Sequence, residues 1–246
     1  MYWDLASEDD RHLHLSRYEF ARNRFQSDWT CLDAACGSGY GTSFLAEKVR
    51  QAEGVDVDPH AIAFATKTYS KQNVAYRCAD LQFKLPFEDH TFNAIASFET
   101  FEHVADQRTM LSEFHRVLKP GGIIVISTPD RNVSQSIGLD NRFHVAERPK
   151  REFVNLLTDV FVLEELFGHG RGEPIARHWR TIHQCLRLGT CLTSSKLRSR
   201  IEAKLAQQFG WLRSHFYKMS VGGIQPDPCV DRTTFMYVIA VARKCK

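Results

Sequence analysis

Short apolar runs alternate with helical patterns between residues 29 and 128. The strand-like runs cover residues 30–34, 54–57, 74–78, 92–97 and 123–127. A helical pattern follows the first run and extends to Val49. Asp58 and Pro59 together resemble the start of a second helix, and a third helical pattern covers 107–118. This alternation of short strands and helices predicts a parallel sheet with helices on both of its faces.

The rest of the chain predicts two more strands, with a basic segment between them. We expect a helix over 148–158 and strands over 160–167 and 234–242. Between Arg171 and Ser220 there are ten Lys or Arg against two Asp or Glu, whereas the remainder has 22 against 27. Apolar residues from Leu197 to Phe216 recur every three or four positions, which is typical of a helix. We therefore expect a basic helical insertion over 171–230, and a helical cap over 1–28.

Composition narrows the class of protein. The 246 residues are 43% hydrophobic and 25% charged, which is typical of a globular domain. No apolar run approaches the roughly 20 residues of a membrane-spanning helix, and the acidic N-terminus lacks the apolar core of a secretory signal. The seven cysteines include no CxxC pair, so we expect reduced thiols, no structural metal and a cytoplasmic location. The basic segment 171–220 leaves peripheral contact with a membrane open.

A glycine-rich turn follows the first predicted strand. The segment 32–41 reads LDAACGSGYG, so its glycines are spaced G-x-G-x-G, and Asp33 lies four positions ahead of Gly37. The dinucleotide fingerprint is G-x-G-x-x-G, and a carboxylate nearby would repel its pyrophosphate. Backbone N–H groups beside an acid suit a zwitterionic amino-acid group better, because its ammonium is attracted to Asp33. Turn glycines without any ligand are the alternative.

Acidic residues end the next two predicted strands. Asp56 lies 17 residues beyond Gly39, where a carboxylate can accept hydrogen bonds from both hydroxyls of a ribose. Asp58 is better interpreted as a helix N-cap. Asp80, which precedes Leu81, could accept a hydrogen bond from an adenine amine or close a turn, and both interpretations stay open.

In this order the motifs resemble those of class I S-adenosylmethionine-dependent methyltransferases. The resemblance rests on four segments and covers nearly the whole chain: LDAACGSGYGT, GVDVDP, CADLQFKLPFEDHTFNAIASFETFEHV and LSEFHRVLKPGGIIVISTP. It implies a single methyltransferase domain over 1–246, with an α/β, Rossmann-like sheet of seven strands whose last strand is antiparallel. The implied cofactor is S-adenosyl-L-methionine, with S-adenosyl-L-homocysteine as product.

The resemblance also implies a cofactor site at the strand ends. Its predicted members are Asp33, Ala35, Gly37, Gly39, Asp56, Val57, Asp80, Leu81 and Phe98. Asp33 and the glycines would hold the methionine moiety, and Asp56 the ribose. Asp80 and the Leu81 backbone would hold the adenine, while Phe98 and Glu99 would line the point of methyl transfer. An aromatic face, of Tyr40 or Phe98, could stabilise a sulfonium, although packing is the simpler role for Phe98.

A hydroxyl acceptor requires a base, and two histidines are candidates. His144 follows the fifth strand and therefore lies over the carboxyl edge of the sheet, where ligands bind in open α/β folds. Glu147 lies three residues later and could orient its ring or organise the loop. His103, beside Glu102, is the competing candidate. We expect the catalytic residues to be His144, Glu147 and His103.

The acceptor is predicted only by class. The Asn/Asp-Pro-Pro-aromatic run of amino-methylating nucleic-acid enzymes is replaced by Ser-Phe-Glu-Thr over 97–100, and Pro228–Cys229 lies too far along the chain for a cytosine-C5 enzyme. A magnesium route through Glu99, Asp140 and Asn141 fits poorly. We expect a small-molecule or biosynthetic hydroxyl acceptor, with the basic insertion acting toward an anionic substrate, toward a membrane or as a solvated cap. An RNA-binding protein and a non-catalytic cofactor-binding homologue are the alternatives, and the oligomeric state is not predicted.

Overall fold

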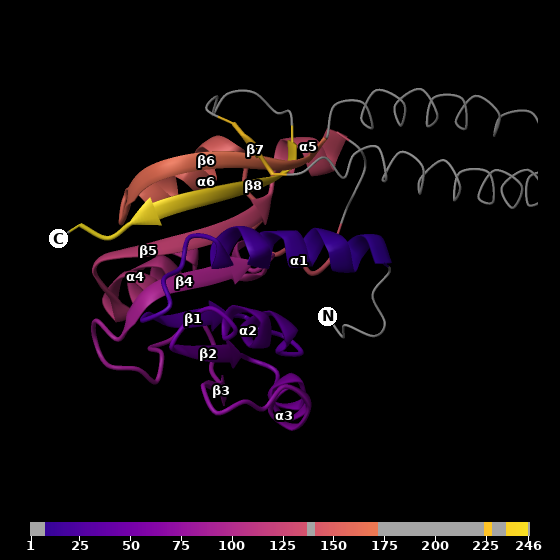
Figure 1. Ribbon diagram of the computed structural model, residues 1–246. Helices are drawn as coiled ribbons and strands as arrows, with labels where there is room; N and C mark the ends of the chain where they lie inside the picture. The colour runs from indigo at the N-terminus through magenta and orange to yellow at the C-terminus, as the bar shows by residue number, and fades with distance from the viewer. Residues whose placement is uncertain (1–7, 137–140, 172–223, 228–234, 246) are drawn as a thin grey trace, which may run out of the picture.

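The computed structural model describes residues 8–136, 141–171, 224–227 and 235–245 (Figure 1). Its helical elements are α1 (Glu8–Arg22), α2 (Tyr40–Leu45), α3 (Pro59–Thr68), the 3₁₀ turn η2 (Phe101–His103), α4 (Gln107–Val117), α5 (Arg131–Ser136) and α6 (Lys150–Thr158). Its strands are β1 (Thr30–Ala34), β2 (Gln51–Asp56), β3 (Val74–Cys78), β4 (Phe92–Phe98), β5 (Leu118–Pro129), β6 (Val162–Arg171), β7 (Gln225–Pro226) and β8 (Phe235–Arg243).

The described strands form one sheet in the order β3-β2-β1-β4-β5-β8-β6-β7. Strands β1 to β5 pair in parallel, and β8 is antiparallel to both β5 and β6. The predicted seven-stranded fold with an antiparallel last strand is therefore confirmed. The two-residue strand β7 adds an eighth strand at the edge, next to β6. Because the chain order reverses between β1 and β4, the two strand ends diverge there, which is where open α/β sheets bind ligands.

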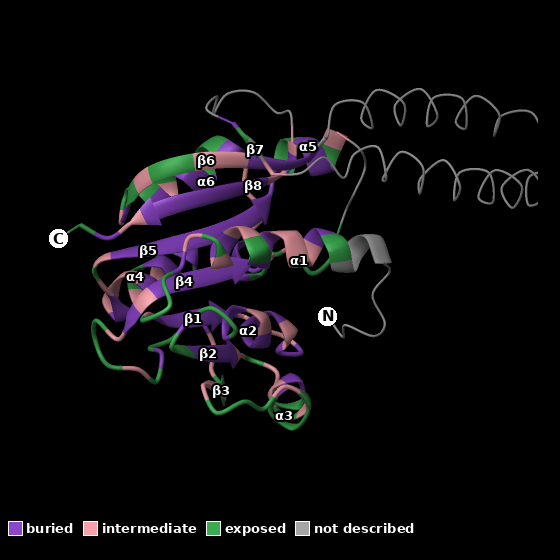
Figure 2. Ribbon diagram, viewed as in Figure 1, coloured by how far each residue is buried: buried purple, intermediate pink, exposed green. Residues whose placement is uncertain are grey.

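Two apolar clusters lie on opposite faces of the sheet, so helices cover both faces as predicted. One cluster includes Tyr18 and Ala21 of α1 and Leu45 of α2. The other includes Phe114 of α4 and Phe153 of α6. Figure 2 shows the central strands buried, whereas α3 and β6 at the margins carry exposed residues. In Figure 1 helix α1 lies across the sheet, in contact with β4 and α2.

Several predicted boundaries shift for local reasons. The helix expected to continue to Val49 ends at Leu45, because the N–H groups of Glu47 and Lys48 bond carbonyls three residues back and β2 already begins at Gln51. Strand β5 begins at Leu118 and not at residue 123, so residues 119–122 lie inside a strand, where Gly121 has φ +76° and the register with β4 shifts. Helix α6 begins at Lys150, after its N-cap Pro149.

The long helix expected over 197–216 and most of the insertion 171–230 lie outside the described residues. Among the described helices, none is long and apolar enough to cross a membrane.

Candidate active site

The turn after β1 holds a tight backbone path at the carboxyl edge of the sheet. Ala35, Gly37 and Gly39 all have positive φ, of 65°, 54° and 87°. A Cβ added at Gly39 would lie 2.5 Å from the Ala65 Cβ and 2.8 Å from the ring of Tyr76. The close approach that requires glycine at position 39 is thus made by α3 and β3 of the protein itself.

Asp56, at the end of β2, braces this turn. Its Oδ2 accepts a hydrogen bond from the Gly37 N–H at 2.8 Å, and its Oδ1 accepts one from the Asp58 N–H at 3.0 Å. Asp58 in turn caps α3 by accepting from the His60 N–H at 2.8 Å, which confirms the predicted N-cap. The Asp56 carboxylate is therefore held in place by two backbone donors.

The carboxyl group of Asp33 lies behind the glycine turn and is completely buried. It accepts hydrogen bonds from the Thr42 hydroxyl at 2.7 Å and from the Tyr18 hydroxyl at 3.2 Å. Burial raises the pKa of Asp33 from 3.8 to about 7, although the hydrogen bonds from Thr42 and Tyr18 act in the opposite direction. The buried Asp33 carboxyl group therefore stabilises the glycine turn through its contacts inside the protein.

Asp80 and Leu81 form the third part of this edge, after β3. Asp80 Oδ1 accepts a hydrogen bond from the Gln82 N–H at 2.9 Å, so this carboxylate closes a turn. Both residues also line the cavity described next. The two interpretations left open for Asp80 are therefore compatible, because Oδ1 serves the turn while the residue still faces the cavity.

A cavity of about 700 Å³ opens along the carboxyl edge from β3 to β5. All of the predicted cofactor residues except Asp33 and Gly39 contribute to its lining. We call the part formed by the ends of β1, β2 and β3 the glycine-loop side. The part formed by the segments after β4 and β5 is the histidine side, to which Glu99, Glu102, His103 and His144 contribute.

The aromatic residues at the centre pack against one another. The ring of Tyr18 lies edge-on to those of Phe98 and Tyr40, with centroid distances of 5.0 and 5.5 Å. Phe98 and Tyr40 line the cavity, and Phe98 is 7% exposed. This burial agrees with a packing role for the Phe98 ring.

Glu99 follows β4 and lines the cavity. Its φ is 52°, and strained conformations of non-glycine residues cluster at functional sites. Its Oε1 accepts a hydrogen bond from the Ser127 hydroxyl at 3.2 Å and lies 3.4 Å from Nη1 of Arg17. Asn141 also lines the cavity, but Asp140, the other predicted magnesium ligand, lies outside the described residues.

Arg17 of α1 is a site residue that the sequence analysis missed. Its guanidinium is completely buried, stacks 4.2 Å from the centroid of the Tyr237 ring and donates from Nε to His169 Nδ1 at 3.2 Å. Burial, and next the charge of Arg17, lower the pKa of His169 from 6.5 to about 3. An arginine on an amphipathic helix is usually exposed, so no local signal in the sequence indicates this position.

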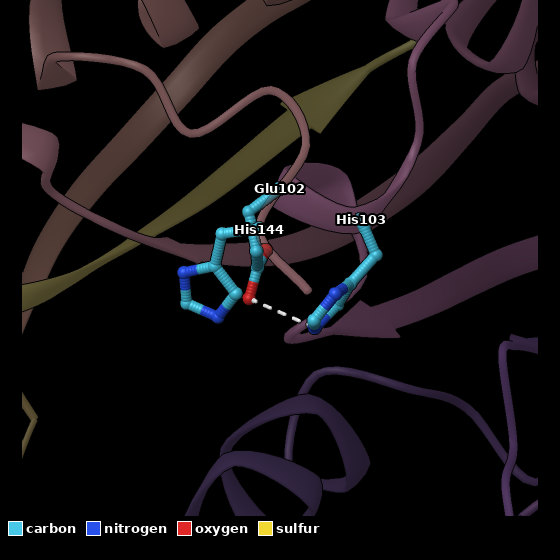
Figure 3. Close-up of side chains that lie close together, drawn as sticks. All are labelled: Glu102, His103 and His144. Atoms are coloured by element: carbon cyan, nitrogen blue, oxygen red, sulfur yellow. Dashed lines mark ion pairs between the residues drawn. The ribbon is translucent and has the colours of Figure 1, made fainter. Parts of the chain in front are cut away.

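The histidine side contains Glu102, His103 and His144 close together (Figure 3). Glu147 Oε2 lies 3.1 Å from His144 Nδ1, within hydrogen-bond distance, and Glu147 also contacts the Ser134 hydroxyl. His103 Nδ1 lies 2.9 Å from the carbonyl oxygen of Phe143. Burial, and next the charge of Glu99, raise the pKa of Glu102 well above its ordinary range.

Long-range contacts bring the two histidine segments together. The Ala146 N–H donates to the Glu102 carbonyl at 3.0 Å. Gln107 Nε2 donates at 2.7 Å to the carbonyls of both Phe101 and Ala146, and Gln107 Oε1 accepts from Arg148 Nε at 3.0 Å. The rings of His103 and His144 consequently meet edge to face, with centroids 4.9 Å apart. These residues are about 40 positions apart in the sequence, so no spacing rule predicts the pair.

Residues 32–126 match the family described as methyltransferase domain. Over 159 residues the chain is 36% identical to the Mycolicibacterium smegmatis protein named "Probable S-adenosylmethionine-dependent methyltransferase", covering 61% of this chain and 60% of that protein. Residues 32–126 therefore carry a methyltransferase domain, and the chain has the fold of the class I S-adenosylmethionine-dependent methyltransferases. S-adenosylmethionine is therefore its cofactor, as predicted.

Further similarities agree with this class I fold. A ubiquinone biosynthesis O-methyltransferase of Idiomarina loihiensis is 31% identical over 117 residues, which are 46% of this chain and 48% of that protein. A solved complex between the Haloferax volcanii Trm112 methyltransferase activator and a methyltransferase contains a similar fold. The superposition with that complex has a TM-score of 0.64 at 18% sequence identity, and it covers 99% of this chain and 96% of the matched chain. The chain spans about 60% of the length of the Mycolicibacterium smegmatis relative and about half of that of the Idiomarina loihiensis relative.

Proposed function

We propose that this class I methyltransferase transfers the methyl group of S-adenosylmethionine to a hydroxyl oxygen of a small-molecule or biosynthetic acceptor. The observation that carries the proposal is one cavity that joins the braced glycine turn to an oriented histidine. The likeness to a ubiquinone biosynthesis O-methyltransferase supports an oxygen acceptor.

The residues present fit the cofactor. Gly37 would face the methionine moiety, the Asp56 carboxylate would accept from the ribose hydroxyls, and Asp80 with the Leu81 backbone would meet the adenine. Asp33 and Gly39, which do not line the cavity, would shape the turn from behind. When bound, the cofactor supplies an activated sulfonium methyl group, so the protein has mainly to align the acceptor and exclude water.

His144 is the proposed base. Glu147 accepts a hydrogen bond from Nδ1, which leaves Nε2 unprotonated and able to take a proton from a hydroxyl. Its partly buried ring lines the cavity on the histidine side. His103 is the alternative, since its Nδ1 is also engaged by an oxygen.

Cofactor binding is tested by calorimetry with S-adenosylhomocysteine. Asp56→Ala removes charged hydrogen bonds and should weaken binding by roughly 1.5–3 kcal/mol, about 10- to 100-fold. Asp58→Ala, the same substitution two residues away, is the matched control and should leave the affinity unchanged. A wild-type protein that does not bind S-adenosylhomocysteine would contradict the proposal.

The acceptor reaction is tested by S-adenosylhomocysteine release with catechols, phenols and methyl glycosides. His144→Ala should retain cofactor binding and lose about 100- to 10,000-fold in turnover, the usual contribution of a positioned base. Full turnover by this variant from pH 6 to 9 would refute the assignment, and His103→Ala would then be the decisive variant. The anionic-substrate, membrane and RNA interpretations rest on the basic segment 171–220, of which the structure describes only Arg171.

A further inference from the structure

The histidine side contains a buried carboxylate oxygen that the proposed reaction does not use. Glu102 is completely buried, and one of its oxygens, Oε2, accepts a hydrogen bond from the Thr128 hydroxyl at 3.1 Å. The other oxygen, Oε1, has no hydrogen-bond partner among the described residues. Buried polar atoms are almost always satisfied, so this oxygen calls for a cationic partner or a donor.

Two imidazole rings flank this oxygen. His103 Nε2 lies 3.9 Å from Glu102 Oε1, too far for a hydrogen bond. Potential ligand atoms of Glu102, His103 and His144 all lie within 4.8 Å of one another. In Figure 3 the rings of His103 and His144 stand on either side of the Glu102 carboxylate. Modest side-chain rotations would bring one atom of each residue to a common ion, whose bonds to such ligands are about 2.0–2.2 Å long.

The outer contacts of both histidines leave the same ring nitrogen available. A carbonyl oxygen only accepts, so His103 Nδ1 carries the proton that it donates to the Phe143 carbonyl. His144 Nδ1 likewise donates to the Glu147 carboxylate. In each neutral ring the lone pair is then on Nε2. A carboxylate or carbonyl on the far nitrogen is the usual support of a metal-binding histidine.

We infer that Glu102, His103 and His144 form a binding site for a divalent transition-metal ion such as Zn²⁺. Two neutral imidazoles and one carboxylate suit Zn²⁺ and its neighbours in the first transition row, whereas Mg²⁺ and Ca²⁺ prefer oxygen ligands alone. Three protein ligands leave at least one position open, as in catalytic rather than structural zinc sites. All three residues line the cavity, so the open position is accessible to a ligand there.

The role of the ion rests on the proposed function. A hydroxyl oxygen of the acceptor would occupy the open position, and coordination would lower the pKa of that hydroxyl so that its proton passes to water. The resulting alkoxide would form the O–CH₃ bond as the S–CH₃ bond breaks, and its negative charge would cancel the positive charge of the sulfonium. With the ion bound, Nε2 of His144 would be a ligand, and water would take the proton that His144 takes in the metal-free reaction.

Metal binding is measured on the full chain without cofactor or acceptor. Co²⁺ is the spectroscopic probe, since a tetrahedral site gives visible absorption bands, and Zn²⁺ should displace it at one ion per chain. Glu102→Gln retains an oxygen for Thr128 but loses the charge, and it should weaken Co²⁺ binding more than the outer variant Glu147→Gln. The outer variant should weaken it by roughly 10- to 100-fold. His60→Asn, at an exposed histidine, is the control and should bind as the wild type does.

The spectrum also separates this site from thiolates. Visible bands that disappear in both Glu102→Gln and His103→Asn support the site, provided that circular dichroism shows both variants folded. No bands in the wild type, or bands with thiolate charge transfer that persist in Glu102→Gln, would overturn it. That failure would leave S-adenosylhomocysteine binding and the His144 base untouched, whereas loss of S-adenosylhomocysteine binding with Co²⁺ binding intact would refute only the proposed function.

Discussion

The glycine-loop side and the histidine side of the cavity differ in how their polar atoms are satisfied. On the glycine-loop side the protein itself supplies partners for the carboxylates: both oxygens of Asp56 accept from backbone N–H groups, and Asp33 accepts from two hydroxyls. The exception is the buried hydroxyl of Ser38 in the same turn, which has no partner among the described residues. On the histidine side Glu102 Oε1 has no hydrogen-bond partner among the described residues. The Nη atoms of Arg17, on the neighbouring α1, have none either, although Nη1 lies 3.4 Å from Oε1 of Glu99. The first side is a rigid frame built mainly from backbone, and the second is a set of charged side chains whose pairing is incomplete.

This difference follows from how each side is assembled. The glycine-loop side is made by short segments that follow consecutive strands, so that turn geometry and capping rules determine it locally. The histidine side joins η2 to residues about 40 positions later, through Gln107 and the Ala146 N–H. We expect variants on the first side to affect folding and cofactor binding, and variants on the second to affect the acceptor reaction.

The largest expected loss of stability comes from a substitution in the glycine turn. Gly39→Ala combines a positive φ, worth about 1–2 kcal/mol, with overpacking against Ala65 and Tyr76, worth about 1–3 kcal/mol. Urea unfolding should show a loss of roughly 2–5 kcal/mol, together with weaker S-adenosylhomocysteine binding.

Gly121→Ala isolates the backbone contribution. Gly121 has φ +76°, but an added Cβ would have no atom within 4 Å. This variant should lose only about 1–2 kcal/mol and bind S-adenosylhomocysteine normally. Equal losses for the two glycines would show that packing against α3 and β3 is not what requires Gly39.

The next effect concerns the buried acid of the same side. Because the pKa of Asp33 is about 7 in the folded chain and 3.8 ordinarily, folding favours its protonated form. The stability that this contributes is complete below pH 3.8 and is lost as the pH rises through about 7. The wild type should therefore lose stability relative to Asp33→Asn between pH 4 and 8, by no more than about 4 kcal/mol. Unfolding both proteins in urea at four pH values checks this, since all other groups cancel, and parallel curves would contradict it.

The sequence predicts these two sides to very different degrees. The parallel strands and the Asp58 cap were predictable, because each depends on local patterns along the chain. The antiparallel last strand was predicted only from the resemblance to class I methyltransferases. The sequence predicted less well why position 39 requires glycine, because the residues that crowd this position belong to α3 and β3. Arg17 and the meeting of His103 with His144 could not be derived, because only the folded sheet brings α1, η2 and residues 141–148 to one cavity.

Gln107 allows the two sides of the cavity to be separated by changing a single side chain. Gln107→Leu removes both hydrogen bonds that join the Phe101 and Ala146 carbonyls, which should cost about 1–3 kcal/mol of stability. Methyl transfer should fall at least tenfold, while S-adenosylhomocysteine affinity stays the same, because no described contact of Gln107 reaches the glycine turn.

Asn73 provides the matched control for Gln107. Its Nδ2 also donates to two carbonyls, those of Ala46 and Val49, at the end of the sheet away from the cavity. Asn73→Leu should lose comparable stability and keep both cofactor binding and turnover. If Gln107→Leu weakened S-adenosylhomocysteine binding as much as it slowed turnover, the two sides would be a single unit.

The smallest effect comes from the helix N-cap that adjoins the glycine-loop side. Asp58→Ala removes the acceptor for the His60 N–H and should cost about 1 kcal/mol, the typical value for an N-cap. The backbone N–H that Asp58 donates to Asp56 is retained in this variant, so S-adenosylhomocysteine affinity should change less than threefold. Calorimetry on Asp58→Ala and Asp56→Ala side by side tests whether the Asp56 carboxylate is held by backbone alone. A tenfold loss for Asp58→Ala would mean that the α3 cap is itself part of the frame, and that this side also depends on its side chains.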